Sequence, residues 1–132
     1  MKTFISILIF TFFSKSPLGV TLDISEDITA AIKTGVASNV VKYFSANVDM
    51  KIIEKEGVYS KAQAELILKD FFTKNPIKSF SIIHKGASKN GEQFAIGIYE
   101  SISGQKIRSY FLFKKTEGGL AIQQFRFEPQ DE

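Results

Sequence analysis

The chain has 132 residues, of which 44% are hydrophobic and 23% charged, and its formal net charge is +3. That length suits a single domain, and the composition excludes a disordered or low-complexity chain. The sequence holds no cysteine and one histidine, which excludes a disulfide scaffold, a thiolate metal site and a zinc site built from several histidines. We therefore expect neither a metal ion nor another cofactor.

Residues 1–20 have the pattern of a signal peptide. Lys2 precedes an apolar run from Phe4 to Phe13, about ten residues long, whereas a membrane-spanning helix needs roughly 20. Cleavage between Ser16 and Thr21 leaves residues 21–132 as a single exported domain, periplasmic or extracellular. The alternative is that the run forms a buried N-terminal strand. No later segment reaches about 18 apolar residues, so we expect no membrane attachment after cleavage.

The basic residues do not indicate a nucleic-acid partner. Lys2 and Lys15 leave with the leader, so the formal charge of the mature chain falls from +3 to about +1. The remaining lysines are scattered among acidic residues, whereas a nucleic-acid-binding protein usually gathers basic residues on one face. We therefore expect no binding to nucleic acid.

The first part of the mature chain predicts two helices. Asp23 and Glu26 have the spacing of a capping box, and Gly35 suits the left-handed end of the helix that follows. One face of this helix carries the apolar residues Ile24, Ile28, Ala31 and Ile32. Ser38 can cap a second, short helix. Its apolar residues are Val40, Val41, Tyr43 and Phe44.

Two extended segments and a third helix come next. Alternation predicts a strand over residues 48–53 and a short extended piece over residues 57–59. Ser60 and Gln63 form a second capping box, and Asn75-Pro76 ends the helix that they start. The apolar stripe of this helix consists of Ala64, Ile67, Leu68, Phe71 and Phe72.

From Ile77 onward the apolar period changes from about 3.6 to about 2, which predicts strands. In the first strand, the pattern puts Phe80, Ile82 and His84 on one side. Glycine turns near residues 90–91, 103–104 and 118–119 separate it from strands over residues 93–101, 105–115 and 120–128. Strands joined by such short turns form an antiparallel meander.

Both faces of this predicted sheet are apolar. Phe94, Ile96 and Ile98 lie opposite Ala95, Gly97 and Tyr99, and Tyr110 and Leu112 lie opposite Ile107, Phe111 and Phe113. Because a solvated face should be polar, we expect a partner to cover part of the outer face. Gly97 within a strand indicates a bulge or a close approach of another chain segment.

The order of these elements resembles the nuclear transport factor 2-like superfamily, also called cystatin-like, which includes ketosteroid isomerase and polyketide cyclases. The resemblance covers residues 23–128 and lies in segments 64–72, 94–99 and 122–127. More narrowly, the chain is similar to small exported bacterial domains of unknown function. The resemblance implies an α+β fold with N-terminal helices on the concave face of a curved, mainly antiparallel sheet. It also implies a cavity between helices and sheet, and homodimers that form through the outer face of the sheet.

Seven residues are candidates for ligand binding: Tyr43, Tyr59, His84, Tyr99, Glu100, Arg108 and Tyr110. The tyrosines either line a cavity, where their hydroxyls orient a ligand, or pack in the core or an interface. His84 is either a general base in a pocket or a solvated histidine at the rim.

The two arginines allow two interpretations each. Arg108 and Glu100 lie on neighbouring predicted strands, so Arg108 binds a carboxylate at the cavity mouth or forms a surface ion pair worth less than about 1 kcal/mol. Arg126 follows Ile122 by four residues, which puts both on the same face and leaves the same two choices.

No catalytic residue is carried over from the resemblance. Ketosteroid isomerase uses a tyrosine and a protonated carboxylic acid as an oxyanion hole, with an aspartate as the base. Here Asp49 and Asp70 fall on polar faces, and Glu100 is the acid nearest to an apolar stripe.

Three functions from different classes remain. The first is a non-enzymatic exported domain that binds a small apolar or amphipathic ligand, or a protein, through an aromatic-lined cleft. The second is an isomerase or cyclase with His84 or Glu100 as base and a tyrosine as electrophile. The third is a structural homodimer whose cavity is filled by its own side chains.

Overall fold

The structure is a computed structural model and describes residues 24–130. The predicted leader, its cleavage site, the alternative N-terminal strand and the cap at Asp23 lie outside the described residues. None of the helices formed by residues 24–130 has the length and apolar content of a membrane-spanning segment.

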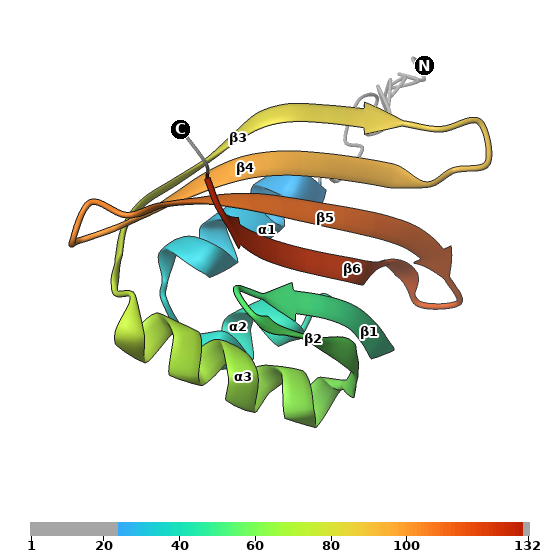
Figure 1. Cartoon of the computed structure of the whole chain (residues 1–132). Helices are drawn as coiled ribbons and strands as arrows, with labels where there is room; N and C mark the ends of the chain where they lie inside the picture. The colour runs from blue at the N-terminus through green and yellow to red at the C-terminus, as the bar shows by residue number, and fades with distance from the viewer. Residues whose placement is uncertain (1–23, 131–132) are drawn as a thin grey trace, which may run out of the picture.

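Helices and strands follow the predicted order, with the helices in the first part of the chain (Figure 1). The elements are α1 (Ile24–Lys33), α2 (Ala37–Val41), β1 (Phe44–Ile52), β2 (Lys55–Ser60), α3 (Lys61–Lys74), β3 (Ile77–Ala87), β4 (Gln93–Ser101), β5 (Lys106–Thr116) and β6 (Gly119–Pro129).

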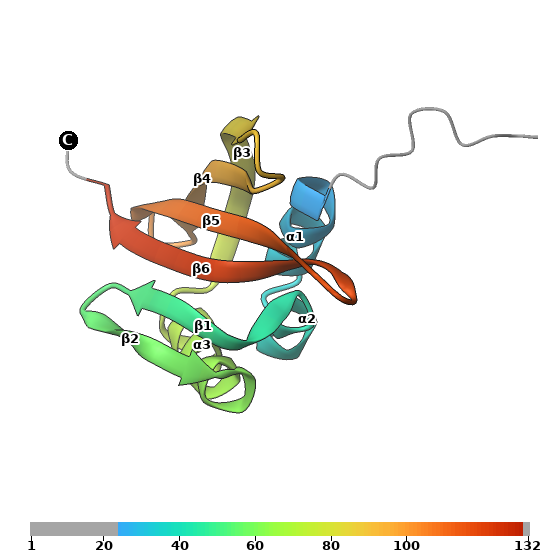
Figure 2. The same cartoon turned by 90° about the vertical axis from the view of Figure 1, so that its right-hand side faces the viewer.

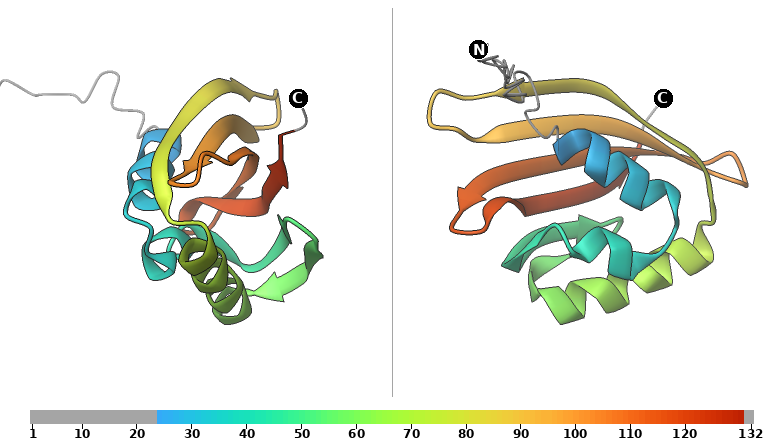
Figure 3. Two further views of the ribbon diagram at one scale, coloured as in Figure 1. Left: turned by 60° about the vertical axis from the view of Figure 1, so that its left-hand side comes forward. Right: turned by 180° about the vertical axis from the view of Figure 1, so that it is seen from behind.

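All six strands belong to one sheet, in the order β2-β1-β6-β5-β4-β3. Neighbouring strands are antiparallel except β1 and β6, which are parallel. The sheet curves, and the helices lie on its concave side (Figures 2 and 3). This arrangement confirms the predicted α+β fold with a curved, mainly antiparallel sheet. Below, the inner face is the one toward the helices and the outer face is the other.

Local signals define the end of α1 and the start of α3 as predicted. Gly35 follows α1 with φ +67°, and its N–H donates to the carbonyl of Ile32, which is a left-handed helix end. At α3, the Ser60 hydroxyl accepts from the N–H of Gln63, and the Gln63 side chain accepts from the N–H of Ser60. The capping box is therefore present in full.

The second helix is shorter than predicted. It spans Ala37–Val41 and is preceded by Val36, so Ser38 lies inside it rather than at its cap, and Phe44 begins β1. The reason lies in β6, whose Ile122 N–H donates to the carbonyl of Tyr43 over 2.7 Å. Pairing with a distant strand therefore extends the chain where the local pattern predicted a helix.

Nine aromatic side chains fill the space between the inner face and the helices. They are Phe44, Phe71, Phe72, Phe80, Tyr99, Phe111, Phe113, Phe125 and Phe127, all buried. Most of their rings pack edge to face or tilted, with centroids 5.0 Å apart for Phe111 and Phe125 and 5.1 Å apart for Phe71 and Phe127, and the rings of Phe72 and Tyr99 are stacked. Of the tyrosines that the sequence suggested for a cleft, Tyr99 thus belongs to the core.

A bulge in β3 changes the face of His84. The register with β4 shifts between Ile82 and His84, which makes Ile83 an extra residue. Ile82 pairs with Gly97 on the inner face, whereas His84 pairs with Ile96 on the outer face. The prediction that His84 shares a side with Phe80 and Ile82 is therefore wrong, because a bulge shifts the alternation by one residue.

A second bulge, in β6, changes the face of Arg126. Ile122 pairs with Phe113 and Gln124 pairs with Leu112, so Gln123 is the extra residue. Ile122 is buried on the inner face, whereas Arg126 pairs with Tyr110 on the outer face. The prediction that Arg126 and Ile122 share a face is wrong for the same reason.

Gly97 allows β3 and β4 to approach closely. A Cβ atom at this position would lie 2.7 Å from the Phe80 ring and 2.8 Å from the carbonyl oxygen of Ser81. The close approach predicted for Gly97 is confirmed, and it brings the Phe80 ring over the inner face of β4.

Candidate functional site

A strip of apolar side chains runs along the outer face of β4 and β5. We call it the outer strip: Phe94, Ile96, Ile98, Tyr110 and Leu112, all partly exposed. Phe94 pairs with Leu112 and Ile96 with Tyr110, so the side chains are cross-strand neighbours. The alternation seen in the sequence identified this apolar face, and the structure assigns it to the outside of the sheet.

His84 and Gly86 of β3 border the outer strip. The His84 ring lies 5.6 Å from the Phe94 ring. A Cβ atom at Gly86 would lie 2.6 Å from the Phe94 ring, so this ring lies directly over the glycine. Neighbouring Ile83, the extra residue of the bulge, is 62% exposed. The apolar surface therefore continues toward the edge strand β3.

Charged side chains flank the outer strip on the side of β6, β1 and β2. Arg126 lies 3.1 Å from a carboxylate oxygen of Glu56, 3.5 Å from Asp49 and 3.9 Å from Glu128. Lys51 lies 3.8 Å from Glu128. These contacts favour the ion-pair interpretation of Arg126. Each exposed pair contributes less than about 1 kcal/mol to folding.

The strip has charged residues near its ends as well. Glu100 pairs with Lys78 at 3.7 Å, and Glu92 with Lys114 at 4.0 Å. Arg108 is exposed opposite Ile98, and the register places Lys106, not Arg108, across from Glu100. The predicted Glu100–Arg108 ion pair is therefore replaced by Glu100–Lys78. An apolar centre within a polar rim is the usual anatomy of a protein–protein interface.

The seven residues predicted for ligand binding do not gather at one place. His84, Glu100, Arg108 and Tyr110 lie on the outer face, at or beside the outer strip. Tyr43 and Tyr59 are half-buried and pack against the core.

Tyr99 is completely buried on the inner face. Its hydroxyl donates to the backbone carbonyl of Asn75. Burial raises the pKa of Tyr99 to about 12. Its phenol therefore stays protonated near neutral pH, bound to backbone within the core.

The inner face holds little chemistry. Among residues 24–130, the buried polar side chains are those of Ser25, Ser101 and Ser109. The same part of the chain contains no group of three or more histidine, cysteine, aspartate or glutamate side chains that could hold a metal ion. These buried side chains are suited to packing.

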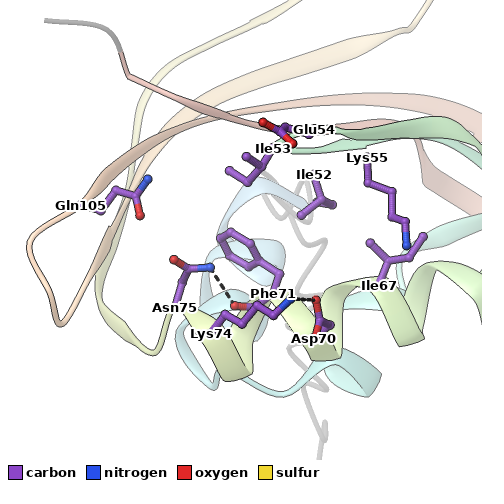
Figure 4. A pocket seen from close by; sticks show the side chains of 10 residues that line it. All are labelled: Ile52, Ile53, Glu54, Lys55, Ile67, Asp70, Phe71, Lys74, Asn75 and Gln105. Atoms are coloured by element: carbon purple, nitrogen blue, oxygen red, sulfur yellow. Dashed lines mark hydrogen bonds and ion pairs between the residues drawn. The ribbon is translucent and has the colours of Figure 1, made fainter.

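A groove of about 480 Å³ lies at one end of the domain (Figure 4). Ile52 and Ile53 form one wall and Ile67 and Phe71 of α3 the other, with Lys55 among the polar residues at the rim. The sequence did not indicate this groove, because its walls come from segments far apart in the chain and its polar residues resemble any solvated turn.

Family comparison identifies most of the chain with one group of sequences. The profile described as "Domain of unknown function (DUF4783)" matches residues 25–128. The crystal structure of a DUF4783 family protein from Bacteroides uniformis ATCC 8492 is 28% identical, with a TM-score of 0.75, over 83% of this chain and 100% of that one. A search of curated proteins found no match.

Two more distant structures define the fold. A domain of unknown function with a cystatin-like fold from Nostoc punctiforme PCC 73102 has a TM-score of 0.68 at 12% identity, over 85% of this chain and 80% of that one. An NTF2-like family protein from Streptomyces avermitilis has a TM-score of 0.62 at 11% identity, over 82% of this chain and 91% of that one. At such identities the likeness concerns the fold alone, and it confirms the cystatin-like, NTF2-like architecture.

Proposed function

The chain belongs to the family described as Domain of unknown function (DUF4783), and we propose that it is a non-enzymatic binding domain whose recognition surface is the outer strip. The occupant of this surface is a second copy of the chain. The observation that carries the proposal is the continuous apolar surface of Phe94, Ile96, Ile98, Tyr110 and Leu112 on the outer face.

The character of the surface favours a twofold pairing of identical chains. In a twofold interface the same patch meets itself, so the patch must be complementary to its own copy. An apolar centre satisfies this condition directly. The rim carries both signs of charge, with the acids Asp49, Glu56 and Glu128 on one flank. Arg108, which has no carboxylate partner within residues 24–130, is available to such an acid of the second copy.

The inner face offers less support for catalysis. An isomerase of the kind outlined above needs an acid or a histidine beside a tyrosine within the cone. Tyr99 is there, but its hydroxyl is bound to Asn75, and the buried polar side chains of residues 24–130 are serines. His84 and Glu100 lie on the outer face. Binding at the outer strip therefore fits the positions of these residues better than proton transfer inside the cone.

Sedimentation equilibrium of the purified protein tests the interface. We expect the wild type to have twice the mass of a single mature chain, and both Ile96→Lys and Leu112→Lys to be monomeric with an unchanged circular dichroism spectrum. Leu66→Lys is the control, because Leu66 is 69% exposed on α3, away from the outer strip and its charged rim, and this variant should stay dimeric. A monomeric wild type at about 100 μM, or dimeric lysine variants, would overturn the proposal.

Export is the second part of the proposed function. The basic and apolar start of the sequence supports a leader over residues 1–20 and a mature domain in the periplasm or outside the cell. Intact-mass measurement of the protein recovered from cell fractions tests this part. We expect the exported fraction to contain a chain that begins between residues 17 and 21. An uncleaved chain confined to the cytoplasm would contradict it.

A further inference from the structure

The groove lined by Ile52, Ile53, Ile67 and Phe71, here called the end groove, lies apart from the outer strip. It opens where the turn between β1 and β2 faces the second half of α3, and Gln105 of the β4–β5 turn borders it. Its volume of about 480 Å³ is within the usual range for small-molecule sites, roughly 300–1,000 Å³. None of its lining residues belongs to the outer strip, so a ligand here and a partner there can bind at the same time.

The walls of the groove are apolar. Figure 4 shows Ile52 and Ile53 pointing from the sheet toward Phe71, with Ile67 on the neighbouring turn of α3. Ile52 and Phe71 belong to the core, whereas Ile53 and Ile67 are only partly buried and pack against it. The groove is therefore a place where the core reaches the surface, and an apolar ligand would cover Ile53 and Ile67.

Ile53 is held in an unusual conformation. Its φ of +58° lies in the left-handed region, and it is the one residue other than glycine with positive φ among residues 24–130. A β-branched side chain is disfavoured there, and turns at such positions usually use glycine or asparagine. The Ile53 N–H donates to the carbonyl of Phe127 over 2.8 Å, which holds the turn in place. Because this strained residue places an apolar side chain at the wall of a groove, we infer that the side chain has a functional role.

The polar rim provides one available cation beside the apolar walls. Lys74 is already paired with Asp70 at 3.0 Å, and the Asn75 amide donates to the carbonyl of Phe71. Lys55 has no carboxylate partner within the described residues, and in Figure 4 its side chain extends from β2 toward Ile67. Glu54, in contrast, stays at the level of the sheet in the same view.

We propose that the end groove binds a small amphipathic carboxylate, with its apolar chain against Ile53 and Ile67 and its carboxylate on the Lys55 ammonium. The two apolar side chains line the same groove, and Lys55 lies at the end of that surface nearest to Ile67. A carboxylate on Lys55 would combine a hydrogen bond with the attraction of opposite charges; a neutral hydroxyl lacks that attraction, and an ammonium group is repelled.

Titration calorimetry with three ten-carbon probes tests this proposal. Decanoate, kept below its micelle concentration, should bind the purified protein with one site per chain, more tightly than decanol and much more tightly than decylammonium. Lys55→Met should weaken decanoate binding by roughly tenfold or more and leave decanol binding unchanged, because it removes the charge and keeps the apolar stem. Ile53→Gly should weaken decanoate and decanol alike, and it relieves the backbone strain, so the variant should fold.

Two control variants distinguish binding in the end groove from binding elsewhere on the surface. Lys69→Met removes an exposed charge from α3 outside the end groove and should leave decanoate binding unchanged. Ile96→Lys, which disrupts the proposed dimer, should also leave it unchanged. Absence of saturable decanoate binding, equal binding of decanoate and decylammonium, or wild-type affinity in Lys55→Met would each overturn the proposal.

Discussion

The hydroxyl of Tyr99, in the middle of the sheet, donates a hydrogen bond to the backbone carbonyl of Asn75, the residue that ends α3. The Tyr99 ring also packs against Phe71 of α3 and Phe127 of β6, with centroids 5.2 Å and 5.5 Å away. One side chain thus joins the curved sheet to the end of the longest helix, and the Asn75 carbonyl, left free at the helix end, obtains a donor.

Replacement of Tyr99 by phenylalanine should change how the free energy of unfolding depends on pH. At neutral pH we expect Tyr99→Phe to lower the free energy of unfolding by about 1–2 kcal/mol, because a buried carbonyl loses its donor. Burial raises the pKa of Tyr99 from 10.0 to about 12. The stability contributed by its phenol is therefore fully present below pH 10 and is lost as the pH rises toward about 12. Denaturant unfolding at several pH values should show the difference between wild type and variant shrinking over this range. Parallel pH profiles would contradict it.

Phe71→Ala should be among the most destabilising single changes. Phe71 is buried, and its ring contacts those of Phe72, Tyr99 and Phe127. We expect a loss of about 3–5 kcal/mol in chemical denaturation, from lost burial and the cavity that remains. Leu66→Ala on the same helix is the control, since Leu66 is 69% exposed, and it should change stability by less than about 0.5 kcal/mol. A loss below about 1 kcal/mol for Phe71→Ala would be inconsistent with this packing.

Replacement by alanine should affect stability differently at two buried serines. The Ser109 hydroxyl is buried without a hydrogen-bond partner within the described residues, whereas the Ser101 hydroxyl accepts from the N–H of Gln105 and bonds the hydroxyl of Ser103. Removing an unpaired buried hydroxyl relieves its desolvation penalty, so Ser109→Ala should be neutral or stabilising by up to about 1 kcal/mol. Ser101→Ala should be destabilising by about 1 kcal/mol. Thermal unfolding of the two variants checks the sign, and a destabilised Ser109→Ala would indicate a partner for that hydroxyl.

Gly97→Ala should be destabilising by about 1–3 kcal/mol, because the new methyl group would overlap the Phe80 ring and the Ser81 carbonyl oxygen. The ring can turn, but the carbonyl belongs to the paired strand β3 and cannot move without breaking the pairing. Gly118→Ala is the matched control, because a Cβ atom there meets nothing within 4 Å. Denaturant midpoints compare the two, and equal effects would argue against the close approach of β3 and β4.

Local patterns predicted the elements well, and long-range pairing explains where they failed. The capping box at Ser60 and Gln63 depends on residues three apart, so the sequence alone was sufficient to predict it. The end of α2 was wrong because Tyr43 bonds to Ile122, which the local pattern cannot anticipate. The parallel pairing of β1 with β6, which brings Arg126 to Asp49 and Glu56, was likewise outside any local signal.

The candidate sites were harder to predict than the fold. Alternation indicated that Phe94, Ile96 and Ile98 share a face, but it could not say which face points outward. A single extra residue at Ile83 was enough to move His84 to the other side. The end groove had no signal at all, because Ile53 and Ile67 come to line one groove only through the packing of α3 against the sheet.

What the sequence determined by itself is the set of interactions made between near neighbours: helix caps, turns, the apolar stripe of α3 and the meander of the last four strands. What only the tertiary structure decided is which side of each strand faces the helices and which distant side chains meet. The physical reason is that hydrogen bonding to adjacent residues is encoded in spacing of a few positions. Strand register, bulges and the filling of the concave face, in contrast, are set by how nine aromatic side chains pack together.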